Sequence, residues 1–279
     1  FSDKTVIGAG IDFNETYSPK EFRVGDVKVG LIAFCESEFG VLTDESEGRG
    51  GYAWVNHPSV NGIIARMKET CDVVLVQVHA GIERIEQPLP EWRMRYKELV
   101  DAGADAVIGS HPHIVQGSET HAGKPIFYSL GNFSFDKTNA DESWRTGLMV
   151  SLEFEGARLV SVTPLPVESI DSVVRMQESG ALLERLALLS NQLQSPSYME
   201  AVNVHVLRLW HTVYKAYYVN AFNTLDPSRP LLQNVKAVIK FLLGRTKVDS
   251  AMLVHNMKIE SHRFAILRAL ALDSQNRPE

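Results

Sequence analysis

The sequence predicts an α/β (α+β) fold followed by an all-helical extension. Up to Glu168, β-branched runs typical of strands alternate with segments of helical character. Beyond Glu168, apolar residues recur only at helical spacing. With 279 residues and 44% hydrophobic content, the chain is long enough for two domains with sizeable cores. We therefore expect one domain at residues 1–168 and a helical extension at 169–279.

The composition excludes several classes of protein. The 28 Lys and Arg residues against 34 Asp and Glu residues give a net charge of −6, and no run of five or six like charges occurs. Composition therefore favours neither a nucleic-acid partner nor a basic membrane-surface patch, and we expect no nucleic acid. No apolar run reaches the roughly 20 residues that span a bilayer. Cys35 and Cys71 are expected to be buried free thiols.

The first strands and helix follow from local patterns. Alternating apolar residues over 22–34, interrupted at Gly25 and Asp26, predict a β-hairpin whose second strand is buried. The polar, glycine-rich segment 41–51 predicts a mobile surface loop. A helix is expected from Pro58 to Glu69, followed by a strand over 72–79 that is buried on both faces.

A second helix and strand complete a βαβ unit. The helix is expected over 90–102, with Pro90 in its first turn and Gly103 after its end, and the strand over 105–109. Parallel strands joined by a helix lie in one sheet. His79 and His111 should therefore emerge near one another at the carboxyl edge, where binding sites of open α/β sheets lie.

The remaining elements complete a mixed sheet and the extension. A strand is expected at 125–130, and a hairpin at 148–154 and 159–167. Four helices follow, centred on residues 182–193, 206–217, 235–242 and 253–267. Helices this apolar do not stay separately solvated, so the extension should pack on the first domain or form a homodimer.

Three histidines at two strand ends form the densest group of reactive side chains. They are His79, His111 and His113, and imidazole is the commonest side-chain ligand of Zn, Fe and Mn. Residues two apart on an extended segment share a face, and Pro112 favours an extended His111. His111 and His113, which flank Pro112, are thus expected to bind a metal ion from the same side. Histidines held only by ordinary hydrogen bonds are the alternative.

Polar residues nearby are candidates for supporting this site. Glu83 follows His79 by four residues and is a candidate to accept the second N–H of a ligating imidazole, or to form a loop salt bridge. Asn132 and Asp136 follow a predicted strand at the same rim. An Asx-type turn is the alternative role for Asn132.

Several of these motifs together resemble one family. The segments HAGIE, LVDAGADAVIGSHPHIVQG and GKPIFYSLGNFSFD resemble the bacterial capsule-synthesis CapA family, also called the poly-γ-glutamate synthesis family. With the segment that begins at Ile7, the resemblance extends to about Val167. It implies a calcineurin-like metallophosphatase fold, a mixed β-sandwich flanked by helices, with two metal ions bound on loops at strand ends.

The resemblance also implies roles for individual residues. His79 matches the histidine of the family's HWG-x-E motif, and Glu83 matches its glutamate. His111 and His113 match the paired histidines of the GHHPH motif, so these three histidines would be metal ligands. Asn132 lies in the SLGNF signature, to which we assign no chemical role from the resemblance.

The chain departs from the family pattern in three places. Ala80 replaces a tryptophan and Ser110 replaces the first histidine of GHHPH, and neither change removes an expected ligand. The family's amino-terminal ligands are an Asp in a GD motif, a Glu in an NLE motif and an Asn-His pair. They should precede a segment like residues 7–11, and this chain has none there. Either the chain is an amino-terminally truncated part of a longer protein, which the start at Phe1 favours, or half of the metal centre has been lost.

The resemblance implies a function in making capsule or cell-envelope polymer. One reading is a dinuclear phosphoesterase that uses Mn, Zn or Fe on a phosphorylated or polymer substrate. The alternative is a non-catalytic accessory or polymer-binding subunit of a capsule or poly-γ-glutamate synthase complex. A barrel-type amidohydrolase would need ligands at later strand ends, which a helical extension does not supply. The family often carries an amino-terminal membrane anchor with an extracytoplasmic domain, and location stays open.

Overall fold

The structure is a computed structural model that describes residues 5–135, 142–171, 173–178, 180–215, 230–243, 254 and 257–275. The chain divides into two compact units, one ending at Met199 and one beginning at Glu200. The first unit extends past Glu168, where the sequence placed a boundary. It does so because one strand of a hairpin runs through Glu168 and the helix that follows packs against the same unit.

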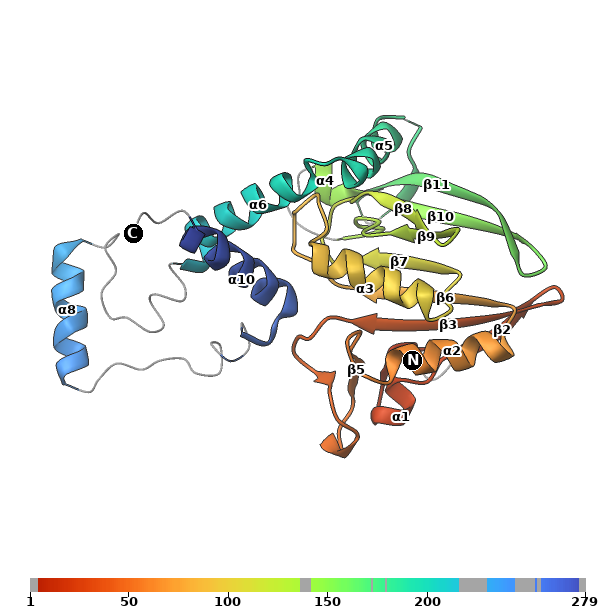
Figure 1. Cartoon of the computed structure of the whole chain (residues 1–279), viewed down its shortest axis with the longest axis horizontal. Coiled ribbons are helices and arrows are strands. Elements are labelled where there is room, and N and C mark those ends of the chain that lie inside the picture. The colour runs from red at the N-terminus through yellow and green to blue at the C-terminus, as the bar shows by residue number, and fades with distance from the viewer. Residues whose placement is uncertain are drawn as a thin grey trace. The chain divides into compact units, whose positions relative to one another are not determined.

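The main sheet of the first unit has six strands in the order β2-β3-β6-β7-β9-β8 (Figure 1). Their bounds are β2 Lys20–Val24, β3 Val27–Cys35, β6 Val73–His79, β7 Ala106–Ser110, β8 Ser118–His121 and β9 Lys124–Phe127. Strands β3, β6, β7 and β9 are parallel, whereas β2 and β8 pair antiparallel at the edges. The predicted mixed sheet is confirmed, as is the hairpin turning at Gly25, whose φ is 58°.

Two crossover helices lie on one face of this sheet. They are α2 Val60–Thr70 and α3 Pro90–Asp101, and they pack on β6, β7 and β9 (Figure 1). Trp92, Tyr96 and Leu99 of α3 are almost completely buried. Gly103 has a φ of 124°, a conformation that favours glycine, so it ends the helix as predicted.

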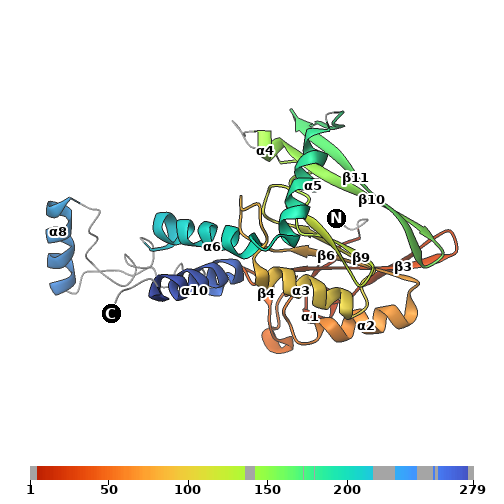
Figure 2. The same cartoon turned by 45° about the horizontal axis from the view of Figure 1, so that its top comes forward.

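A second sheet and a helix lie on the opposite face (Figure 2). The sheet is antiparallel, with strands β10 Thr146–Glu155, β11 Arg158–Ile170 and β12 Val173–Met176, and it is followed by α5 Ala181–Gln194. Buried Val115, Phe127, Leu148 and Leu186 join the two sheets and α5 in one cluster. The hairpin is therefore confirmed but lies in its own sheet. The predicted class, α/β (α+β) with facing sheets flanked by helices, is confirmed.

A third, small sheet replaces part of the expected loop. It contains β1 Ala9–Gly10, β5 Gly51–Ala53 and β4 Val41–Leu42, with α1 Phe13–Thr16 and the 3-10 turn Glu45–Glu47 beside it. Leu42 is fully buried, and its carbonyl accepts a 2.7 Å hydrogen bond from the Tyr17 hydroxyl. A surface loop is confirmed for 43–50, where the residues are mostly exposed. The prediction is wrong at Val41–Leu42, because a strand of two residues is too short to show alternation.

A buried carboxylate ties α5 to the sheet. Glu119 of β8 accepts two hydrogen bonds of 2.6 Å from Arg93 of α3, and others from Tyr128 and Gln194. Burial alone would raise the pKa of Glu119, but these hydrogen bonds outweigh it and lower the pKa to about 2. The carboxylate therefore stays ionised and holds three elements together.

Beyond Met199 the described residues are helical, as predicted. The helices are α6 Tyr198–Leu209, its π-helical continuation Trp210–Tyr214, α8 Leu231–Leu242 and α10 Glu260–Gln275. The small helix α4 Glu142–Arg145 belongs to the first unit. The rings of Tyr214 and His262 pack with centroids 4.9 Å apart. Parts of the helices predicted at 206–217 and 253–267 lie outside the described residues. No helix in the described ranges combines the length and apolar character needed to cross a bilayer.

Candidate metal centre

Three neighbouring parallel strands deliver the candidate site to one edge of the main sheet. In their register Cys35 of β3 lies beside His79 of β6, and His79 lies beside Ser110 of β7. The residues that follow each strand therefore meet at the carboxyl edge. This confirms the expectation that His79 and His111 emerge together.

A hydrogen bond links the rings of His79 and His111. His79 Nε2 lies 3.0 Å from His111 Nδ1, and His79 Nδ1 lies 3.2 Å from the Ser110 hydroxyl. Desolvation lowers the pKa of His79, and the charge of His113 lowers it further. When His111 donates from Nδ1, its Nε2 lone pair is directed away from His79. Neutral imidazole with a free Nε2 is the form that binds metal ions.

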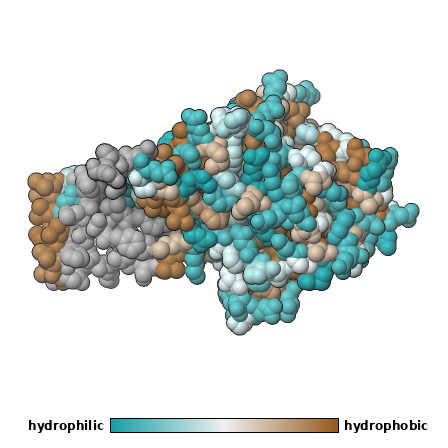
Figure 3. Space-filling model, viewed as in Figure 1, coloured by the Kyte–Doolittle hydropathy of each residue, from teal (hydrophilic) through white to brown (hydrophobic). Residues whose placement is uncertain are grey.

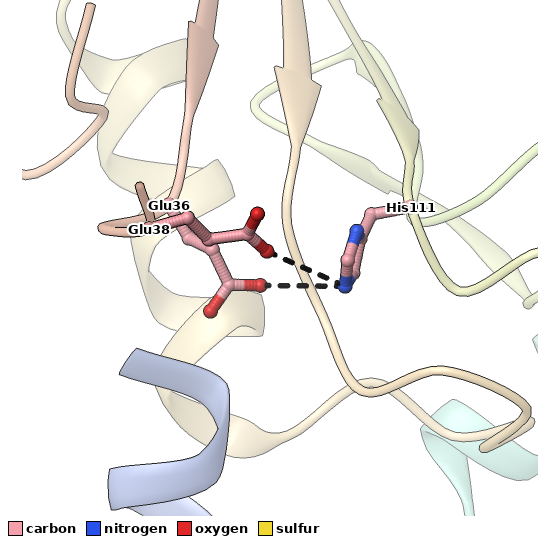
Figure 4. A group of neighbouring side chains, drawn as sticks. All are labelled: Glu36, Glu38 and His111. Atoms are coloured by element: carbon pink, nitrogen blue, oxygen red, sulfur yellow. Dashed lines mark ion pairs between the residues drawn. The ribbon is translucent and has the colours of Figure 1, made fainter. Parts of the chain in front are cut away.

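Two glutamates face that nitrogen, as Figure 4 shows. Carboxylate oxygens of Glu36 and Glu38 each lie 3.9 Å from His111 Nε2. Glu36 is fully buried and accepts a 2.9 Å hydrogen bond from the Gly81 N–H. Burial raises the pKa of Glu38, and the charge of Glu83 raises it further. Two carboxylates this close and partly desolvated are unfavourable unless a cation compensates them.

The donor atoms fit a divalent metal ion. One ligand atom from each of Glu36, Glu38 and His111 lies within 4.8 Å of the others. Among the described residues, this is the set of His, Cys, Asp or Glu side chains that lies close enough together to hold one metal ion. Ligand bonds of about 2.0–2.2 Å place neighbouring donors about 3.3–3.6 Å apart around a tetrahedral ion. The separations of 3.9 Å between the carboxylates and His111 Nε2 therefore require only a small inward movement of the side chains to bind one ion. Nitrogen and carboxylate donors suit Zn, Mn and Fe alike.

Asn132 orients the third histidine. Its Oδ1 lies 2.8 Å from His113 Nδ1, while its Nδ2 donates to the Trp144 carbonyl at 3.0 Å. Since the amide oxygen only accepts, His113 donates from Nδ1 and keeps its Nε2 lone pair for a ligand. The His113 ring stacks on Trp144, with centroids 4.8 Å apart. Asn132 thus accepts the second N–H of a candidate ligand imidazole, which is the role that was expected of Glu83.

The other predicted residues are placed as follows. Glu83 is exposed and acts through its charge on Glu38, and its role as an imidazole partner stays a prediction. The rings of His111 and His113 have centroids 6.0 Å apart, so the structure brings all three histidines into one region. Their assignment as metal ligands also stays a prediction. Asp136 lies outside the described residues.

The histidines reach the site through a strained turn and not through an extended segment. His111 has a φ of 102° and His113 a φ of 60°, so the expectation that Pro112 holds His111 extended is wrong. The turn is fixed from outside, since Arg84 N–H donates to the Pro112 carbonyl at 2.8 Å. A Cβ at Gly81 would approach the Pro112 ring to 2.9 Å. Left-handed conformations of non-glycine residues persist where surrounding structure imposes them, commonly at functional sites.

Glu36 and Glu38 are functional candidates that sequence reasoning missed. They directly follow β3, the neighbour of β6, and so end at the same edge as the histidines. The buried run 27–35 was itself recognisable. Extending the argument about strand ends to that run would have identified both glutamates.

Replacing Asn132 by alanine is expected to weaken binding of Zn²⁺ or Mn²⁺ by roughly 10-fold, because the His113 ring loses the acceptor that fixes its tautomer. Isothermal titration calorimetry on the metal-free protein measures this. Ser161→Ala is the control: it removes a hydroxyl that forms an exposed hydrogen bond with Thr163 in the second sheet, and this variant should bind the metal ion normally. Unchanged affinity in Asn132→Ala would show that His113 does not depend on this contact.

Comparison with known proteins gives a consistent result. Residues 4–137 match the family described as bacterial capsule synthesis protein PGA_cap. The capsule biosynthesis protein CapA of Bacillus anthracis is 29% identical over 171 residues, covering 60% of this chain and 41% of that protein. The PGA biosynthesis protein CapA of Bacillus subtilis (strain 168) is 30% identical over 171 residues, covering 58% and 43%. The chain thus spans about two fifths of the length of these relatives.

Among solved structures, a candidate 5'-nucleotidase from Staphylococcus aureus in complex with alpha-ketoglutarate is similar to this chain. The sequence identity is 20% and the TM-score 0.35, and the match covers 61% of this chain and 33% of that one.

Proposed function

We propose that the chain, which is similar to bacterial capsule synthesis proteins over residues 4–137, is part of a metal-dependent phosphoesterase acting in the synthesis of capsule or another cell-envelope polymer. The observation that carries this proposal is the meeting of Glu36, Glu38 and His111 beside two further histidines at one sheet edge. Carboxylates and imidazoles gathered around one point are the ligand set of hydrolytic metal sites.

Different residues of the chain would bind the metal ion and position its ligands. Glu36, Glu38 and His111 would hold one ion, which supplies Lewis-acid chemistry for a phosphoryl group. The Gly81 N–H fixes the Glu36 carboxylate, and His79 fixes the His111 ring. We propose His113, through its Nε2, as a donor toward a second ion, and His79 as a further donor when its Nε2 releases the hydrogen bond to His111.

Phosphoester chemistry suits this electrostatic arrangement. A phosphoryl group carries negative charge, which the glutamates alone would repel. Divalent ions held by Glu36 and Glu38 reverse the sign of the local charge, and the N–H groups of neighbouring imidazoles add hydrogen-bond donors. The proposed substrate is a phosphorylated compound or an envelope polymer.

Metal content and hydrolysis measured on the same protein test the proposal. The protein is loaded separately with Mn²⁺, Zn²⁺ and Fe²⁺, dialysed, and assayed by elemental analysis and with p-nitrophenyl phosphate and bis-p-nitrophenyl phosphate. We expect a bound ion and hydrolysis that chelation removes. Bound ion without hydrolysis of either ester would favour a polymer-binding accessory subunit. No bound ion under any loading condition would contradict the metal site itself.

A further inference from the structure

Helix α8 presents a continuous apolar side to solvent. The side chains on it and their exposed fractions are Leu231 81%, Leu232 71%, Val235 48%, Ile239 50%, Leu242 75% and Leu243 59%. Their spacing of three and four residues places them on one side of an α-helix. In Figure 3, drawn from the same direction as Figure 1, brown atoms gather over α8. Five of these large aliphatic side chains lie on the twelve residues of α8 and Leu243 directly follows it, and an exposed apolar side of this size calls for a partner.

The sequence on either side of α8 and within it carries only positive charges. In a chain with a net charge of −6, no acidic residue occurs between Asp226 and Asp249, whereas five basic residues do. They are Arg229, Lys236, Lys240, Arg245 and Lys247. Lys236 is exposed on the helix itself. An apolar side combined with basic residues and no acidic ones is the pattern of helices that bind anionic membrane surfaces.

The length of α8 determines how it would meet a bilayer. Twelve residues at 1.5 Å each extend only about 18 Å, against a hydrocarbon core of about 30 Å. A helix of this length therefore lies in the interface with its apolar side toward the acyl chains. Lysines beside such an apolar side reach the headgroups through their flexible stems.

We propose that α8 binds the surface of an anionic phospholipid bilayer, with its apolar side inserted below the headgroups. This proposal is independent of the proposed hydrolase function. A second copy of the chain is a poorer occupant, because two α8 helices packed through their apolar sides would bring their lysines together without any acidic partner between Asp226 and Asp249. Anionic headgroups favour both features of the helix.

Co-sedimentation of the full chain with vesicles tests this proposal. We expect binding to vesicles of phosphatidylcholine with roughly 30% phosphatidylglycerol, and weaker binding to phosphatidylcholine alone. Raising the salt from about 0.1 M to about 0.5 M should reduce binding, because the Debye length shortens. The double variant Val235→Asp, Ile239→Asp should reduce the bound fraction by roughly 10-fold. The control Val204→Asp, Val213→Asp alters exposed residues, 61% and 52% accessible, of α6 and its continuation, and should bind normally.

A fluorescent reporter keeps the test valid if the double variant fails to fold. In Leu232→Trp, emission of the introduced tryptophan should shift to the blue when anionic vesicles are added. No vesicle binding by the unaltered chain, or no shift of this emission with vesicles, would overturn the proposal. An emission already shifted without lipid, together with a dimeric mass in solution, would assign the helix to a second copy and also overturn it.

Discussion

The variant His111→Gly is expected to bind Zn²⁺ or Mn²⁺ at least roughly 100-fold more weakly than the unaltered protein, while its metal-free form loses no more than about 1 kcal/mol of stability. The loss of affinity follows because His111 Nε2 is the nitrogen that faces both Glu36 and Glu38. Changes in residues that merely support a ligand already lower affinity by about 10–100-fold, so loss of the ligand should exceed that range. Hydrolysis of phosphoesters should be lost together with the ion.

The stability of this variant follows from the backbone. His111 has a φ of 102°, which glycine adopts readily and which strains other residues by about 1–3 kcal/mol. Glycine also increases the entropy of the unfolded chain, an opposing effect of about 1 kcal/mol. The hydrogen bond to His79 is lost as well. The free energy of unfolding should therefore stay within about 1 kcal/mol of the original value or rise.

Calorimetric titration with metal and urea unfolding in the presence of a chelator measure both quantities. His121→Ala is the matched control, since His121 pairs with Asp101 at the opposite edge of the sheet and should leave metal affinity unchanged. Retained affinity in His111→Gly, combined with a stability loss above about 2 kcal/mol, would show that His111 is a structural residue.

Gly109→Ala is expected to lower the free energy of unfolding by about 3 kcal/mol. A Cβ at Gly109 of β7 would lie 2.1 Å from the Tyr128 carbonyl oxygen and 2.9 Å from the Phe127 oxygen. Because both contacts are with backbone, no side-chain rotation relieves them. The chain after β9 would have to move away from β7, which also separates Asn132 from His113 and so weakens metal binding.

Gly62→Ala is the control, because it makes the same glycine-to-alanine change at a position where the added Cβ meets no backbone atom outside its own helix. Gly62 lies inside α2, and the nearest atom to an added Cβ is Arg66 Nη1 at 3.4 Å. Alanine there should raise the free energy of unfolding by about 0.5–1 kcal/mol through helix propensity. Urea denaturation compares the three proteins. A loss smaller than about 1 kcal/mol in Gly109→Ala would mean that the backbone around Tyr128 shifts at little cost.

The sequence carried information about long elements and much less about short or distant contacts. The buried strand ending at His79 and the helix between Pro90 and Gly103 have local signals that the structure confirms. The two-residue strand Val41–Leu42 has none, because its burial is set by residues such as Tyr17 from another segment. Its environment could not be deduced from neighbours in sequence.

The same distinction applies to the candidate metal centre. The meeting of His79 and His111 follows from the βαβ unit alone. The approach of Glu36 depends on β3 pairing with β6, an arrangement without a sequence motif of its own. The left-handed turn at His111 depends on contacts from the segment around Gly81. A histidine disfavours this left-handed backbone conformation, so the residues next to it in the sequence cannot predict the turn.

The hydrogen bonds at Glu119 bear on how such a protein can be divided or recombined during evolution. A recombination breakpoint at Glu168 would separate α5 from the sheet, uncover the cluster around Phe127, and remove the Gln194 donor from the Glu119 carboxylate. A breakpoint after α5 would leave both intact. The smallest segment that a gene fusion could transfer as a folded unit therefore includes α5 and the first residues of α6, where the buried Tyr198 hydroxyl donates a 2.6 Å hydrogen bond to the Pro88 carbonyl.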